Sequence, residues 1–64
     1  MKPSLVPGDV VRREDTGELV CVRGLEQGKR CWLVRVFWWT SAGVSIEELL
    51  SPDDLTLVRE ARHE

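Results

Sequence analysis

Residues 31–39 read Cys-Trp-Leu-Val-Arg-Val-Phe-Trp-Trp, and they hold all three tryptophans and the single phenylalanine of the chain. Side chains alternate between the two faces of a strand, so Trp32 to Trp38 place an unbroken apolar row on one face. That face predicts the floor of a hydrophobic core. The opposite face is also largely apolar and carries Cys31, Leu33, Arg35, Phe37 and Trp39. A chain of 64 residues can hardly cover both faces, so we expect aromatic surface to remain for a partner.

Length and composition indicate one small globular domain over residues 1–64, with its folded part at about 7–58. The 42% hydrophobic and 31% charged residues argue against disorder. No apolar run approaches the roughly 20 residues that span a bilayer. Residues 1–7 contain two prolines and lack the apolar segment of a signal peptide. We therefore expect a cytoplasmic protein without membrane contact.

Turn signals divide the chain into five short strands. Pro7-Gly8-Asp9 predicts a turn before the first strand, and Gly17 ends a polar turn at a position that often requires positive φ. The glycine-bounded segment 24–30 predicts a hairpin loop. The predicted strands are residues 10–13, 18–23, 31–39, 44–47 and 56–58, the fourth of them half-exposed.

The segment Ser51-Pro52-Asp53-Asp54-Leu55 carries the signals of a helix start. It has an N-capping serine, a proline at the first helical position and acids in the first turn. Because the segment is too short for a full helix, we predict a single 3₁₀ turn before the last strand. Residues 59–64 are predicted to form a frayed tail.

This order of elements resembles the SH3-like and Tudor-like small barrels. The resemblance rests on Pro-Gly-Asp-Val-Val at 7–11, the long aromatic middle strand and Ser-Pro-Asp-Asp-Leu-Thr-Leu-Val at 51–58. The chain looks most like short bacterial and phage proteins that begin with a Gly-Asp-Val-Val strand. The resemblance implies an all-β, five-stranded SH3-like barrel, a fold that hosts many unrelated roles. The core that we predict is Val11, Val20, Val22, Trp32, Val34, Val36, Trp38, Ile46, Leu55 and Leu57.

Catalytic chemistry finds little support, and we predict no catalytic residue and no cofactor. Glu47 and Glu48 are adjacent, so on a strand they point to opposite faces and cannot act as a paired acid and base. The only histidine, His63, lies in the tail, remote from every serine, and there is no glycine-rich phosphate loop.

A more distant similarity connects the chain with the plasmid-borne, trimethoprim-resistant dihydrofolate reductases, which are similar in length and also start with a Gly-Asp strand. Their pore-lining strand carries Val-Gln-Ile-Tyr, where this chain has Val44-Ser45-Ile46-Glu47. The two apolar positions match, but the glutamine and tyrosine that contact ligands in that family are replaced. A carboxylate at Glu47 is electrostatically unfavourable beside a phosphate-bearing cofactor.

Cys21 and Cys31 are too few to define a zinc site, which needs about four ligands, so we expect no metal. The two cysteines would form a disulfide if they faced each other across a hairpin in an oxidising compartment. The favoured alternative is that they are small buried residues in a reducing cytosol.

The leftover aromatic face predicts a non-enzymatic interaction module that binds a protein partner or a second copy of itself, as a homodimer or a higher oligomer. We expect Leu33, Arg35, Phe37 and Trp39 to form the contact surface, because Trp and Arg are enriched in interface hot spots. An interfacial Arg35 would need an acidic partner, such as Glu47 or Glu18.

Three alternatives remain open, and the most remote is an enzyme like the plasmid-type dihydrofolate reductases described above. In a nucleic-acid-binding barrel, Phe37 and Trp39 would stack bases while Arg12, Arg23, Arg30 or Arg35 contact phosphates. The net charge of −2 opposes this, although residues 1–35 carry +2 and residues 36–64 carry −4. Alternatively, the tail or the arm at residues 1–6 buries Phe37 or Trp39 within the monomer.

Overall fold

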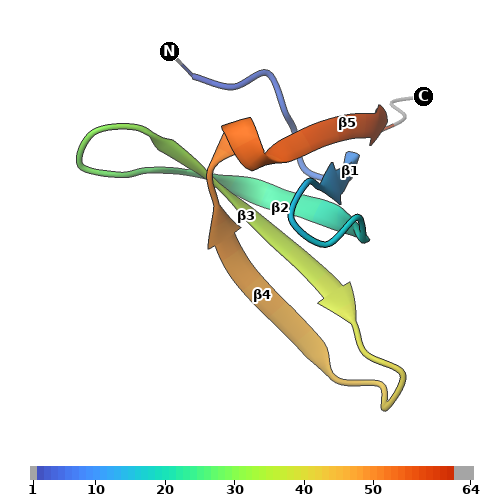
Figure 1. Ribbon diagram of the computed structural model, residues 1–64. Helices are drawn as coiled ribbons and strands as arrows, with labels where there is room; N and C mark the ends of the chain where they lie inside the picture. The colour runs from blue at the N-terminus through green and yellow to red at the C-terminus, as the bar shows by residue number, and fades with distance from the viewer. Residues whose placement is uncertain (1, 62–64) are drawn as a thin grey trace.

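The computed structural model describes residues 2–61, which form one antiparallel sheet of five strands (Figure 1). Residues 2–61 are all-β with a single 3₁₀ turn, as predicted. Its elements are β1 (Val10–Arg13), β2 (Leu19–Gln27), β3 (Trp32–Trp39), β4 (Ser45–Leu50), η1 (Pro52–Asp54) and β5 (Leu55–Arg59).

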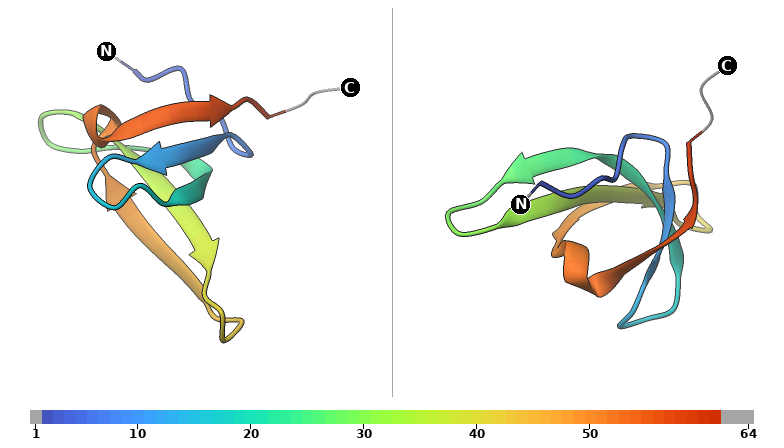
Figure 2. Two further views of the ribbon diagram at one scale, coloured as in Figure 1. Left: turned by 45° about the vertical axis from the view of Figure 1, so that its right-hand side comes forward. Right: turned by 90° about the horizontal axis from the view of Figure 1, so that it is seen from above.

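The strand order in the sheet is β4-β3-β2-β1-β5. β4 and β5 are therefore its two edges, and the sheet curls strongly between them (Figure 2). Within residues 2–61 these two edges are not hydrogen-bonded to each other, and the sheet is therefore not closed into a barrel.

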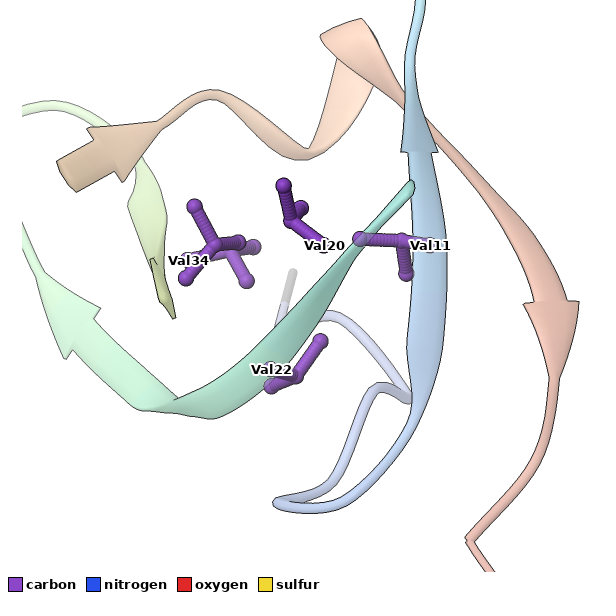
Figure 3. Packing of buried hydrophobic residues seen from close by; sticks show 5 residues of the cluster. Val11, Val20, Val22 and Val34 are labelled. Carbon is purple, nitrogen blue, oxygen red and sulfur yellow. The ribbon is translucent and has the colours of Figure 1, made fainter. Parts of the chain in front are cut away.

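Five valines from the three central strands form the core, and each is at most 2% exposed. The register explains why they meet: Val11 pairs with Val20 and Val22 pairs with Val36, so their side chains share one face. Four of them converge in Figure 3, which shows Val11, Val20, Val22 and Val34 filling the space inside the curl. The alternation along β3 therefore predicted the buried face correctly.

The outer members of the predicted core are less buried. Trp32, Trp38 and Leu55 are half-buried against the valines or at the ends of the sheet, whereas Ile46 and Leu57 are 38% and 45% exposed. The prediction was wrong for the last two because they lie on the edge strands β4 and β5, where no further strand covers them. Leu5, Leu25 and Leu50, absent from the prediction, pack against the core instead.

The second strand is longer than predicted. Gly24 does not begin a loop, since β2 continues to Gln27 and pairs with β3 as far as Trp32. The register shifts between Val22 and Gly24, so this glycine marks a β-bulge where the strand bends. β4 likewise extends to Leu50, beyond its predicted end.

The predicted turn chemistry is confirmed at two places. Gly17 has a φ of 76°, and Ser51 caps η1 by accepting a hydrogen bond from the Asp53 backbone N–H at 3.3 Å. Two acids occupy the first turn of η1, as expected from the sequence.

The C-terminal segment differs from the predicted frayed tail as far as it is described. Arg59 belongs to β5, and the Ala61 backbone N–H donates a hydrogen bond to Asp9 at 2.7 Å. Residues 62–64, with His63, lie outside the described residues.

Candidate functional site

The four residues predicted to form the contact surface lie on one face of β3. Val34 and Val36 point into the core, so alternation directs Leu33, Arg35, Phe37 and Trp39 to the other side. We call this side the outer face. Its cross-strand neighbours are Cys21, Gly24 and Glu26 on β2 and Ser45, Glu47 and Leu49 on β4.

Trp39 is the most exposed large side chain of the outer face, at 67%. It lies at the end of the long β3–β4 hairpin, which projects away from the rest of the sheet (Figure 1). Phe37, two residues earlier, is half-buried because the Arg23 guanidinium lies 4.4 Å from its ring centre. The outer face therefore combines one open indole with one ring covered by a cation.

The N-terminal arm, residues 2–7, does not cover this indole. It lies beside Gly24, Leu25 and Trp32, with which it lines a pocket of about 360 Å³. The Lys2 ammonium is 5.6 Å from the Trp32 ring centre. The alternative in which the arm at residues 1–6 buries Trp39 is therefore wrong for residues 2–6. Residue 1 and residues 62–64 of the tail lie outside the described residues.

Two arginines and two glutamates form an ion-pair network across the outer face. Arg35 bonds to Glu26, with its Nε at 2.8 Å, and reaches Glu47 at 3.3 Å. Arg23 contacts the other oxygen of Glu47 at 2.6 Å. The hydrogen bond to Glu26 is the main cause that raises the pKa of Arg35 above its ordinary value, and Glu47 adds to it. The network is electrically neutral.

Glu47 was one of the two acids expected beside Arg35, and it pairs with this arginine within the same chain. Glu26 was missed because residue 26 was placed in a loop. A strand continuing past Gly24 would have brought Glu26 opposite Leu33 and so next to Arg35.

A second charged cluster lies on the inner side of the sheet. Arg13, at the end of β1, bonds to Asp15 at 3.0 Å and to Glu48 of β4 at 2.9 Å. Its guanidinium also lies 5.5 Å from the Trp38 ring centre. The pKa of Asp15 falls below its ordinary value, mainly because Arg13 donates hydrogen bonds to it. Arg13 thus connects β1 to β4, two strands that do not pair.

Arg12 and Arg30, the additional residues expected to contact phosphates, are exposed but belong to different parts of the fold. Arg12 lies on β1 opposite Leu19, and Arg30 lies in the loop between β2 and β3. Figure 1 shows this loop at the opposite end of the sheet from β1. These two arginines therefore do not extend the outer face into one basic groove.

The two cysteines are free. Cys21 pairs with Phe37, whereas Cys31 lies beyond the Gln27–Trp32 pair at the other end of β2. Six strand residues separate these positions, or about 20 Å, whereas a disulfide needs Cα atoms within about 7 Å. Cys31 is exposed, so the interpretation as two buried residues is wrong for this one.

Residues 2–61 contain no group of three or more His, Cys, Asp or Glu side chains arranged to hold a metal ion. The same residues include no helix with the length and apolar character needed to cross a membrane.

The chain matches no protein-family model, no curated protein and no solved structure.

Proposed function

We propose that this protein is a non-enzymatic interaction module that binds another protein through the outer face of β3 and β4. The observation that carries the proposal is Trp39, which is 67% exposed beside an ion-pair network that is already neutral. An exposed tryptophan that no segment of residues 2–61 covers is typical of an interface hot spot. Burial of such a side chain is worth about 1.5–3 kcal/mol or more.

The paired arginines favour a protein partner over a nucleic acid. Glu26 and Glu47 neutralise the charges of Arg23 and Arg35, so this network offers no net positive charge to a phosphate. Single-strand binders instead combine stacking aromatics with a groove of available positive charge. Arg12 and Arg30 lie too far apart along the fold to supply such a groove beside Trp39.

The proposal includes membership of the SH3-like class of small barrels and a cytoplasmic location. The strand order and the 3₁₀ turn before β5 support the first part, together with the sequence motifs at 7–11 and 51–58. The distance between the two free cysteines supports the second, because neither would need an oxidising compartment.

Site-specific photo-crosslinking tests the proposal. A photoreactive phenylalanine analogue replaces Trp39 in one version of the chain and Val58, 48% exposed on the opposite edge strand β5, in a matched control. We expect discrete protein adducts from position 39 and none from position 58. Adducts to nucleic acid, or equal labelling at both positions, would contradict the proposal.

The mass of the adduct identifies the kind of partner. An adduct of twice the chain mass means self-association, and any other protein mass means a different partner. Light scattering over a dilution series checks the first result independently, because a homodimer dissociates as it is diluted.

A further inference from the structure

We infer that the free edge of β4 is a docking site for an extended, basic peptide segment, which adds a sixth strand to the sheet. This inference deepens the proposed function and rests on it, since the added strand would lie next to the outer face. It names the chemistry of the partner: alternating β-forming residues with Lys or Arg.

The first observation is the shape of the edge. β4 is one of the two edge strands of the sheet, and five of its six residues are exposed. It pairs with β3 through six consecutive residues without a register shift, so the edge is straight. Residues 45–50 contain no lysine and no proline, two usual means of blocking an edge. Charged side chains can also block an edge, but the two glutamates of β4 are both paired with arginines of other strands. Such an edge presents unpaired backbone donors and acceptors to another strand.

The second observation is the charge along this edge. Residues 44–58 include four acids, Glu47, Glu48, Asp53 and Asp54, and no Lys or Arg. The two glutamates are paired with arginines of other strands, but Asp53 and Asp54 make no ion pair within residues 2–61. Both lie in η1, directly after β4, so the edge ends in uncompensated negative charge. This charge favours a cationic segment.

The two glutamates at the centre of β4 disfavour a second copy at this edge. When two β4 strands pair antiparallel about a two-fold axis at the middle of the strand, Glu47 faces Glu47 or Glu48 faces Glu48. Like charges directly opposite each other destabilise a strand pair. A foreign strand with basic residues avoids this contact.

The third observation is what lies next to the edge. Along β4, Ser45, Glu47 and Leu49 are the cross-strand partners of Trp39, Phe37 and Arg35. An added strand lies about 5 Å beyond β4, with every second side chain on the outer face. Backbone hydrogen bonds to β4 and apolar contact near Trp39 would therefore act on the same peptide.

The test is a selection of random octapeptides, displayed on phage, against the immobilised full-length protein. We expect enriched peptides that alternate β-branched or aromatic residues with Lys or Arg. Synthetic copies of these peptides should slow the hydrogen exchange of β4 backbone amides more than that of β5 amides. Each peptide is compared with a version in which Glu replaces Lys and Arg, which should bind more weakly.

Two charge variants and one control locate the site. Ser45→Lys and Asp53→Lys place positive charge along the β4 edge, and each should weaken peptide binding by roughly two- to fivefold at low salt. Val58→Lys places the same charge on β5, the other edge, and should leave binding unchanged.

Several outcomes would overturn the inference: no enrichment, enriched peptides without basic residues, or binding without protection of β4. A dimer that itself protects the β4 amides would show that a second copy occupies the edge. If peptides bind through Trp39 but leave β4 unprotected, the proposed function survives and this inference fails. If Trp39→Ala has no effect on any partner, the proposed function fails as well.

Discussion

The carboxylate of Asp9 and the backbone N–H of Ala61, 52 positions apart in the chain, are joined by a hydrogen bond of 2.7 Å. The second carboxylate oxygen of Asp9 accepts from the Val6 N–H at 3.0 Å. Asp9 is only 3% exposed and is the one buried charged residue among residues 2–61. The Asp9 side chain thus connects segments near both ends of the described chain. In addition, the backbone N–H of Val22 in β2 donates a hydrogen bond to the backbone carbonyl oxygen of Asp9.

Asp9→Asn should destabilise the fold by about 1–3 kcal/mol. The asparagine keeps one acceptor but directs an N–H₂ group at the second backbone donor, which leaves a buried polar group unsatisfied. Urea denaturation measures the loss, and Asp53→Asn, an exposed position, should change stability by less than about 0.5 kcal/mol. Equal stability of the two variants would show that the buried carboxylate contributes nothing.

Trp38→Ala and Trp39→Ala should separate stability from binding. Trp38 is half-buried and lies under Arg13, so its truncation should cost about 2–4 kcal/mol. Trp39 is mostly exposed, and its truncation should change stability by no more than about 0.5 kcal/mol while weakening association. Thermal unfolding measures the change in stability, and co-purification with the partner identified by photo-crosslinking measures the change in association. Similar destabilisation by both variants would contradict the assignment of faces.

Arg13→Ala should destabilise the sheet by about 1–2 kcal/mol. The side chain is 11% exposed, packs on Trp38 and joins β1 to Glu48 on β4. The neighbouring Arg12→Ala removes an exposed charge from the other face of β1 and serves as the control. Chemical denaturation measures the free energy of unfolding of both variants. If Arg12→Ala lowers it as much as Arg13→Ala, the inference about Arg13 is wrong.

The Arg13–Asp15 pair should make stability depend on pH in the acidic range. The pKa of Asp15 is lowered from 3.8 in the folded state, mainly by the hydrogen bond from Arg13. The carboxylate therefore contributes stability above pH 3.8, and this contribution disappears as the pH falls through the lowered pKa. Asp15→Asn should remove it, so the two stability curves should differ above pH 3.8 and converge below it. If the stability curves of the parent protein and Asp15→Asn stay parallel through this range, the Arg13–Asp15 pair does not stabilise the fold.

Both cysteines should react as free thiols with a thiol reagent, at clearly different rates. Cys31 is exposed and should react rapidly with an aromatic disulfide reagent in the folded protein. Cys21, half-buried opposite Phe37, should react more slowly until the protein is unfolded. Detection of fewer than two thiols in the unfolded protein would mean that a disulfide exists.

Local patterns predicted much of the architecture. Alternation along residues 32–39 identified the buried face, because the period of two is a property of any extended chain. Ser51 and Pro52 predicted η1, and Gly17 predicted a turn, because capping and positive φ depend only on neighbouring residues. The grouping of Leu33, Arg35, Phe37 and Trp39 on one face followed from the same alternation.

What the local patterns could not supply depends on contacts between segments far apart in the chain. The pairing of Gly24 with Arg35 turned an expected loop into a bulged strand and brought Glu26 beside Arg35. Ile46 and Leu57 look like core residues in the sequence, yet they are exposed because β4 and β5 are edges.

The roles of the charged groups were also decided by the tertiary structure. The sequence by itself determined an all-β chain whose central strand has one wholly apolar face and one face that carries Arg35, Phe37 and Trp39. Only folding decided that Asp9 would hold Ala61 and that Arg35 would meet two glutamates. A short-range pattern records which residues share a face, whereas strand order and register determine which faces meet.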